Sequence, residues 1–295
     1  MKLVTWNTQW CCGLDGVVSP QRIVDGARAL ADFDVLCLQE IAVNYPRLRG
    51  DASADQAQAV ASLLPGYQVF FGAAVDEYTA EGRQRFGNLV ATRLPVLRVQ
   101  HHPLPYPADG GVSSMPRMCT VVTVKDPVLG AVRVMTTHLE FYSRKQRMAQ
   151  AIALRELHAE YCAQAAAQPE PSDDGSPFQT KAHTTRAILC GDFNLEAHEP
   201  EYAEICKPFG PADRMGTASA AINSGAWQLW DSHRLLHGEA PHVPTFRLED
   251  RTYGPEPVAC DFVFVSGALK DRVRSLRVDL ATRASDHQPV AVELA

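Results

Sequence analysis

The sequence lacks the cysteine and histidine spacings that organise zinc sites or redox motifs. Its eight cysteines form no C-x-x-C pair and no zinc-finger pattern. Several lie inside apolar runs, as Cys37 and Cys190 do, so we interpret them as small buried thiols in a reducing compartment. Cys11 and Cys12 are adjacent and follow a polar segment discussed below, so a redox or metal role stays open for these two.

Long apolar runs and targeting signals are also absent. No uninterrupted apolar window of 18 or more residues occurs, which excludes an ordinary transmembrane helix. The segment from Met1 to Asn7 is polar by its last residue and has no apolar stretch of the signal-peptide kind, so we expect a cytoplasmic protein without a membrane partner. The G-x-S-x-G elbow, the P-loop and H-E-x-x-H are missing as well, which excludes three common hydrolase designs.

What is present fits a well-packed globular protein. Of 295 residues, 46% are apolar, 8% aromatic and 21% charged, and 28 Lys plus Arg against 34 Asp plus Glu give a formal charge of -6. This mildly acidic balance argues against non-specific coating of nucleic acid, although a local basic groove can coexist with it. No repeat or sharp change in composition marks a boundary, so we predict one domain over residues 1–295.

Short apolar runs rich in β-branched residues recur along the whole chain. They predict strands at 2–6, 34–39, 67–72, 87–92, 119–124, 131–137, 187–191, 261–266 and 288–294. Helices are predicted at 144–167 behind an N-cap at Ser143, from Ser19-Pro20 onward, and at 53–64. Segments 103–117, 168–184 and 238–257 are rich in Pro, Gly or polar residues and predict loops.

The order of these elements favours one fold class. Many strands with irregularly interspersed helices indicate two packed sheets flanked by helices, rather than strict alternation of strand and helix. We therefore predict an α/β fold, a four-layered sandwich of two mixed β-sheets with helices outside.

Polar residues end the apolar runs at six places, where strands would deliver side chains to one rim. These places are Trp6-Asn7-Thr8-Gln9, Leu38-Gln39-Glu40, Thr136-Thr137-His138-Leu139-Glu140, Gly191-Asp192-Phe193-Asn194, Cys260-Asp261-Phe262 and Ser285-Asp286-His287.

Each place alone has an ordinary structural explanation. Glu40 could be a solvated turn residue, and Asp192 with Asn194 could form an Asx-type turn. His138 could be a hydrogen-bonded core histidine, and Asp286-His287 a capping pair. Together, however, the two imidazoles, several carboxylates and two amides suit a hard divalent cation and a phosphorus centre.

In this order and at these distances, the six segments resemble the endonuclease/exonuclease/phosphatase superfamily. That group includes DNases, exonuclease III-like apurinic endonucleases, sphingomyelinases, inositol-polyphosphate 5-phosphatases, deadenylases and tyrosyl-DNA phosphodiesterases. The resemblance runs from residue 3 to residue 294 and implies the DNase-like four-layered sandwich and a Mg²⁺-dependent hydrolase of phosphate esters.

The resemblance also implies a metal site. Glu40 matches the principal ligand of Mg²⁺, Asn7 stands beside it, and Asp286 completes or water-bridges the metal shell, with Mn²⁺ as a substitute ion. The residue types agree with this, because magnesium prefers carboxylate and amide oxygens and retains several waters.

The remaining matches are catalytic. Asp192 matches the residue that orients or deprotonates the attacking water, and Asn194 the amide that holds this water and a phosphate oxygen. His287 matches the imidazole on the scissile phosphate with Asp261 as its orienting carboxylate, and His138 a second phosphate-contacting histidine. A phosphodiester repels hydroxide, so the site needs positive charge from Mg²⁺ and one or two imidazolium groups, together with a base for water.

Some positions depart from the family or are less specific. Gln9 stands where apurinic endonucleases usually carry Asp, which makes that subfamily and a metal ligand there less favoured. The run Thr137-His138-Leu139-Glu140 followed by Arg144, Arg147 and Gln150 is similar to the tyrosyl-DNA phosphodiesterase-like branch, although Phe193 is not typical of that branch. Arg117 and Asn88 are expected to contact the substrate, with a surface role for Arg117 as the alternative.

We therefore expect a Mg²⁺-dependent phosphodiesterase that uses in-line water attack, with a nucleic-acid-type substrate favoured and no protein partner inferred. A phosphomonoesterase, or a phospholipid or inositol phosphate hydrolase of the same fold, is the alternative. A non-catalytic binding module is least favoured, because Glu40, Asp192 and His287 are all present.

Overall fold

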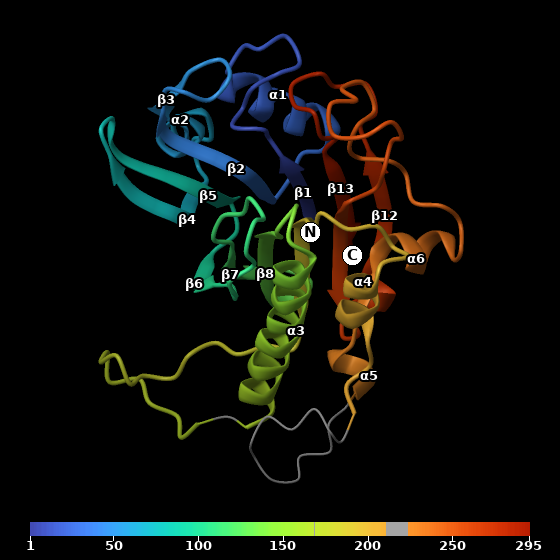
Figure 1. Ribbon diagram of the computed structural model, residues 1–295. Helices are drawn as coiled ribbons and strands as arrows, with labels where there is room; N and C mark the ends of the chain where they lie inside the picture. The colour runs from blue at the N-terminus through green and yellow to red at the C-terminus, as the bar shows by residue number, and fades with distance from the viewer. Residues whose placement is uncertain (168, 211–223) are drawn as a thin grey trace.

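A computed structural model describes residues 1–167, 169–210 and 224–295 and contains two β-sheets (Figure 1). The seven-stranded sheet has the order β12-β13-β1-β2-β5-β4, with β3 paired to β2. Its strands are β1 (Lys2–Asn7), β2 (Val35–Tyr45), β3 (Ala52–Asp55), β4 (Gln68–Thr79), β5 (Gly82–Thr92), β12 (Val273–Val278) and β13 (Val290–Leu294).

The six-stranded sheet has the order β10-β11-β9-β8-β7-β6. Its strands are β6 (Val96–Pro103), β7 (Met118–Asp126), β8 (Gly130–His138), β9 (Ala187–Asp192), β10 (Leu229–Asp231) and β11 (Asp261–Ser266). Both sheets are mixed, since β1–β2 and β8–β9 are parallel pairs and their other pairings are antiparallel.

Helices α1 (Pro20–Leu30) and α2 (Gln56–Leu63) cover the outer face of the seven-stranded sheet, and α3 (Arg144–Ala166) and α4 (Pro200–Cys206) cover that of the six-stranded sheet (Figure 1). The short helix α5 (Ser224–Trp227) contacts α3, and α6 (Ser232–His237) packs against β12 and β11 at the edge of the core between the sheets. A 3₁₀ turn, η1 (Lys270–Arg272), precedes β12. Side chains alternate across each strand: in β1, Leu3 packs between the sheets, whereas Val4 packs with α1 on the outer face. The predicted four-layered α/β sandwich is confirmed.

The core between the sheets is aliphatic. Val35 and Val90 of the first sheet pack in one cluster with Val122, Ile188 and Val263 of the second. Outside the second sheet, a separate cluster joins the sheet to α3 and α4. Face-to-face packing of this kind holds the ends of β1, β8 and β9 near the middle of β2, which is where the predicted polar segments lie.

Some predicted boundaries were wrong. The helix predicted over 53–64 begins only at Gln56, because residues 52–55 pair with β2 and the Asp55 carboxylate accepts a hydrogen bond from the backbone N–H of Gln58 as the N-cap. Strands β3, β6, β10 and β12 were not predicted. The predicted loops 103–117 and 238–257 lack regular strands and helices beyond Pro103, as does 169–184, whereas residue 168 lies outside the described residues.

All eight cysteines are free thiols, and seven are buried. Burial raises the pKa of the Cys11 thiol to about 12 and also raises the pKa of Cys12. Because thiolates are the reactive and metal-binding form, these protonated thiols do not favour a redox or metal role for the pair. Among the described residues, no helix has the length and apolarity needed to cross a membrane.

Candidate active site

The segments that end β1, β8 and β9 meet the irregular middle of β2 at a cavity of about 330 Å³. Of the ten residues predicted for the site, seven line this cavity: Glu40, Arg117, His138, Asp192, Asn194, Asp286 and His287. Asn7 and Asp261 lie behind it and hydrogen-bond to lining residues. Asn88 lines only a small adjoining cavity, together with Glu40, Arg117 and His138.

An irregularity in β2 turns the Glu40 side chain toward the cavity. The pairing of β2 with β5 shifts register between Leu38 and Ile41, and Glu40 has a φ of 60°, in the left-handed region. Such a conformation is costly for a residue with a side chain and is found where function requires it. The Glu40 side chain is 18% exposed, and its carboxylate accepts a 3.2 Å hydrogen bond from the Asn7 amide.

Asn7 connects two acidic groups. Its buried side-chain amide donates to Glu40 and also, at 2.8 Å, to Oδ2 of Asp192. The side-chain oxygen Oδ1 of Asn7 accepts from the backbone N–H of Gln9 at 3.1 Å, which fixes the orientation of the amide group. Asn7 therefore sets the relative position of the two carboxylates.

The acidic groups on the Glu40 side are short of positive partners. Burial and the nearby negative charge of Asp286 raise the pKa of Glu40 to about 7, and burial raises the pKa of Asp286 as well. Asp286 accepts a 3.0 Å hydrogen bond from the side-chain amide of Gln9. The Ser285 hydroxyl also donates to Asp286 at 3.3 Å, and the charge of His287 partly offsets the rise in both pKa values.

Two crowded carboxylates without a lysine or arginine partner among the described residues are a donor set that suits a hard divalent cation. The predicted Glu40 and Asp286 thus fit Mg²⁺ chemically. Asn7 turns its side-chain N–H₂ group toward Glu40 and its Oδ1 toward the Gln9 backbone N–H, so in this orientation it positions Glu40 and is not itself a metal ligand.

Asp192 ends β9, and the chain then turns sharply. Gly191 has a φ of 138°, and a Cβ there would lie 1.9 Å from the carbonyl oxygen of Thr137, so only glycine permits this approach of β9 to β8. The backbone N–H of Asn194 donates to Oδ1 of Asp192 at 2.9 Å. An Asx-type turn is therefore present, and it places both Asp192 and Asn194 on the cavity wall.

His138 is held as a neutral imidazole. The Asn194 side-chain N–H₂ group donates to Nε2 of His138 and to the carbonyl oxygen of Leu139, both at 2.9 Å. Because that carbonyl can only accept, the Asn194 nitrogen is the donor, and Nε2 must then carry a lone pair. Burial and the positive charge of Arg117 hold the pKa of His138 well below its usual range.

His287 has the opposite charge state. Its Nδ1 lies 2.8 Å from Oδ2 of Asp261, and its Nε2 lies 3.6 Å from Oδ2 of Asp192. Burial opposes protonation, but these two carboxylates outweigh it and raise the pKa of His287 well above the usual value. The sequence predicted one or two imidazolium groups, and the structure favours a single one, that of His287. The His287 ring also stacks on Phe246, with centroids 4.3 Å apart.

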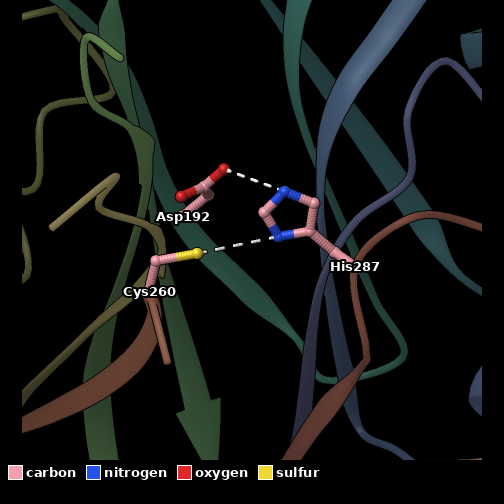
Figure 2. Close-up of side chains that lie close together, drawn as sticks. All are labelled: Asp192, Cys260 and His287. Atoms are coloured by element: carbon pink, nitrogen blue, oxygen red, sulfur yellow. Dashed lines mark hydrogen bonds and ion pairs between the residues drawn. The ribbon is translucent and has the colours of Figure 1, made fainter. Parts of the chain in front are cut away.

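Cys260 adds a thiol beside this pair. Figure 2 shows the Asp192 carboxylate facing one ring nitrogen of His287 and the Cys260 sulfur facing the other. The potential ligand atoms of these three residues all lie within 4.8 Å of one another. This trio could be considered for a metal, but the His287 ring is protonated and burial raises the pKa of Cys260 well above its usual value. Sγ instead faces Oδ2 of Asp261 at 3.6 Å, so the thiol serves as a weak donor to the carboxylate. The carboxylate pair Glu40 and Asp286 fits a cation better.

Arg117 and Asn88 have structural partners. The Arg117 side chain is 6% exposed, and its Nε donates to the Glu140 carboxylate at 3.1 Å. Arg117 nevertheless lines the cavity, so a contact with the substrate stays a prediction. The Asn88 amide is 3% exposed and donates to the carbonyl oxygen of Met118 at 3.1 Å, which links β5 to β7. Its geometry favours a bracing role over a direct contact with the substrate.

The chain matches the profile of the Endonuclease/Exonuclease/phosphatase family over residues 4–287. It belongs to this family. Among curated proteins, none matches the sequence. Members of the endonuclease/exonuclease/phosphatase family are hydrolases that act on phosphate esters and generally use divalent metal ions.

Solved structures share the fold of this family member at low identity. An endonuclease/exonuclease/phosphatase from Beutenbergia cavernae DSM 12333 is 24% identical with a TM-score of 0.61, and the match covers 100% of this chain and 72% of that one. The human Nocturnin catalytic domain with bound sulfate is 20% identical, with a TM-score of 0.60 and coverage of 100% and 93%. The mannosyl-6-phosphatase of Bacteroides thetaiotaomicron VPI-5482 is 18% identical, with a TM-score of 0.58 and coverage of 100% and 99%.

Several lining residues of this family member were missed from the sequence. Phe246 and Tyr253 come from the predicted loop 238–257, and Phe141 and Tyr142 follow β8. These rings form a chain of edge-to-face or tilted contacts, from Phe246 through Tyr253 and Phe141 to Tyr142. Nothing in the local sequence of a Pro- and Gly-rich loop specifies which aromatic turns inward. Arg144 and Arg147, which suggested the tyrosyl-DNA phosphodiesterase-like branch, instead face Glu199 at 3.3 and 3.5 Å.

Proposed function

We propose that this protein is a Mg²⁺-dependent phosphodiesterase. The observation that carries the proposal is the division of charge in one cavity. The protonated His287 stands within 3.6 Å of Asp192, while Glu40 and Asp286 form a separate acidic corner that fits a cation. An anionic phosphate between these groups would meet positive charge on two sides and a carboxylate base on a third.

Asp192 is suited to act on the attacking water. Its Oδ1 is held by the backbone N–H of Asn194, and its Oδ2 accepts from Asn7, so the carboxylate has a fixed direction. In the proposed step, the water oxygen forms a bond to phosphorus, the bond to the leaving ester oxygen breaks, and one water proton passes to Asp192. The leaving oxygen takes a proton from solvent.

The two histidines have different tasks. The protonated His287 donates from Nε2 to a phosphate oxygen and stabilises the negative charge that develops there, while Asp261 fixes its ring. The neutral His138 is bound through Nε2 to Asn194, so it positions that amide. Mg²⁺ held by Glu40 and Asp286, with Asn7 orienting Glu40, would supply further stabilisation of phosphate charge.

The substrate class rests on several observations. The exposed rings of Tyr142 and Tyr253 line the cavity and could stack on bases, which supports a nucleic-acid-type substrate. The runner-up is a phosphomonoesterase, and the structural likeness to a mannosyl-6-phosphatase gives that reading support. We also propose a cytoplasmic location without membrane or protein partner, supported by eight free thiols.

The test is hydrolysis of bis-p-nitrophenyl phosphate beside p-nitrophenyl phosphate, with Mg²⁺ and with excess chelator. We expect Mg²⁺-dependent cleavage of the diester and at least about a 100-fold loss of kcat in Asp192→Asn, the usual size for a removed general base. The exposed Asp173→Asn variant is the matched control and should retain the wild-type rate. Cleavage of the monoester alone would favour the phosphomonoesterase, and cleavage of neither ester would reject the proposal.

A further inference from the structure

One side of the catalytic cavity is apolar although the reaction centre is charged. Six lining residues pack in a single cluster around Ala42 and Ala52, and we call this group the apolar cup: Trp10, Tyr45, Leu48, Val75, Phe86 and Met115. Phe86 is 9% exposed, and the other five are half-buried. The cup leaves apolar surface open to the cavity, which is unfavourable in water unless a ligand covers it.

Five of the six cup residues lie on strands of the seven-stranded sheet or in the segments that follow them, and Met115 comes from the loop before β7. Trp10 follows β1 in a left-handed conformation with a φ of 44°, and its indole N–H donates to the carbonyl oxygen of Arg49 at 2.9 Å. The buried Gln56 amide donates to the Trp10 carbonyl oxygen at 2.7 Å. Tyr45 and Phe86 pack edge to face with centroids 5.8 Å apart. These contacts fix the wall before any substrate arrives.

The charges around the cavity disfavour a substrate with many phosphates. Among the described residues that line it, Arg117 is the only lysine or arginine, and it already pairs with Glu140. Three carboxylates, from Glu40, Asp192 and Asp286, line the same space. Recognition of a polyanion needs several Lys or Arg side chains near its phosphates. The cavity therefore suits one reacting phosphate attached to an uncharged group.

We propose that the apolar cup is a substrate subsite for an uncharged, ring-sized apolar group attached directly to the reacting phosphate. The inference rests on the proposed phosphodiesterase chemistry, and it replaces the nucleic-acid-type substrate with small phosphate esters that carry such a ring. The cup is continuous with the reaction centre at two places. Trp10 directly follows Gln9, whose side chain contacts Asp286. Phe86 and Met115 line the small neighbouring cavity together with Glu40. A ring on the phosphate would thus reach the cup without a linker.

Binding of two non-hydrolysable probes tests the subsite without activity. Phenylphosphonate and methylphosphonate differ only in the group that would enter the cup, and calorimetry with Mg²⁺ present gives both affinities. We expect phenylphosphonate to bind at least about tenfold more tightly than methylphosphonate, because the ring gains apolar contacts that a methyl group cannot make. The double variant Leu48→Asn, Val75→Asn should reduce this preference to below about threefold, with methylphosphonate affinity unchanged.

A matched double variant, Leu280→Asn, Val128→Asn, changes the same residue types at positions 53% and 68% exposed and outside the cup, and it should keep the wild-type preference. Equal affinity of the two probes for the wild type, or a preference that survives the cup variant, would overturn the subsite. If thermal unfolding shows that the double cup variant is not folded, Val75→Asn alone answers the same question.

A hydrolysis experiment tests the subsite and the phosphodiesterase activity separately. Phenyl p-nitrophenyl phosphate and methyl p-nitrophenyl phosphate share a leaving group, and we expect the phenyl ester to have a kcat/KM at least about tenfold higher after correction for uncatalysed rates. Equal cleavage of both esters would reject the subsite and leave the phosphodiesterase intact. Discrimination between the phosphonates without cleavage of either ester would reject the phosphodiesterase and leave the subsite intact.

Discussion

Two histidines face one cavity in opposite charge states, and their partners explain the difference. His287 has a carboxylate on each ring nitrogen, Asp261 at 2.8 Å and Asp192 at 3.6 Å, so protonation is favoured despite burial. His138 receives an N–H from Asn194 at Nε2, and burial together with the positive charge of Arg117 holds its pKa well below the usual value. At the scale of single residues, the site therefore separates a fixed cation from a neutral positioning group.

Asp261→Asn tests the pairing that keeps His287 charged and oriented. An amide is neutral and can present an N–H₂ group to Nδ1, so the ring loses both its counter-charge and its fixed direction. We expect kcat on bis-p-nitrophenyl phosphate to fall by about 100-fold or more, while Mg²⁺ affinity changes by less than about twofold, because Asp261 hydrogen-bonds to His287 and belongs to no predicted metal ligand set. Asp173→Asn serves as the control. A joint loss of Mg²⁺ binding and rate would instead indicate general collapse of the site.

Individual site residues could be predicted well where a short motif fixes them. Gly191-Asp192-Phe193-Asn194 specifies a turn that needs a glycine, a carboxylate and an amide, and the structure places the last two on the cavity wall. Asn88 shows the limit, since an amide in an apolar run looks the same whether it contacts a ligand or a backbone carbonyl. Burial and partner identity decide between the two, and neither is local in sequence.

Among the elements, β2 is the one that positions Glu40 in the proposed metal site. The register shift after Leu38 turns the chain so that Glu40 leaves the ladder and faces the cavity, although the strand continues to Tyr45. The sequence predicted the strand only to residue 39, because Gln39-Glu40 interrupts its apolar run. A bulge and a strand end look alike in sequence, since both are marked by a break in alternation.

The start of α2 gives a measurable consequence of a cap. Asp55 accepts from the backbone N–H of Gln58 at 2.9 Å and ends β3, so it fixes where the strand stops and the helix begins. Asp55→Ala should lower the free energy of unfolding by about 1 kcal/mol, the usual cost of a lost N-cap. Urea unfolding measures the change. The exposed Asp173→Ala variant should leave stability unchanged, and an equal loss in both variants would refute the capping role.

Other elements were missed because their sequences carry weak signals. Strand β10 has only three residues, and β6 and β12 are edge or near-edge strands with charged side chains between the apolar ones. Edge strands need fewer apolar residues because one side is solvated. The central strands β1, β7, β8, β9 and β11 were predicted, since burial on both faces requires continuous apolar runs.

For the whole molecule, a buried polar network ties the second sheet to its helices. Arg133 of β8 is 2% exposed and donates to Nδ1 of His158 in α3 at 2.9 Å, while Nε2 of His158 contacts the carbonyl oxygen of Trp227 in α5 at 2.7 Å. Because arginine can only donate and a carbonyl can only accept, His158 must be neutral with its proton on Nε2. Burial and the charge of Arg133 lower the pKa of His158 to about 3.

This network predicts acid sensitivity of folding. The unfolded chain binds a proton at His158 below its ordinary pKa, whereas the folded chain does so only near pH 3. The stabilisation is therefore fully present above pH of about 6.5 and is lost as pH falls toward 3, by up to about 1.4 kcal/mol per pH unit. Urea unfolding from pH 7 to pH 5 should show a shallower loss of stability in His158→Gln than in the wild type. Equal slopes would contradict this assignment, and the exposed His198→Gln variant should keep the wild-type slope.

The fold and the charged half of the site were predictable, and the apolar half was not. Segments such as Leu38-Gln39-Glu40 and Ser285-Asp286-His287 carry residue types that phosphate chemistry requires, so their order along the chain is informative. Trp10, Leu48 and Met115 belong to ordinary apolar composition and reach the cavity only through the packing of distant elements. Substrate preference therefore depends on tertiary contacts that local sequence does not encode.

The central claim is that Glu40 holds the cation while His287 acts on the phosphate, and Mg²⁺ titration with parallel turnover measurements tests it most directly. Glu40→Gln should weaken Mg²⁺ binding by at least about tenfold, as loss of a charged ligand does, and should slow turnover. His287→Ala should leave Mg²⁺ affinity within about twofold and still lower kcat by about 100-fold or more. Near-normal Mg²⁺ affinity and near-normal turnover in both variants would contradict the account.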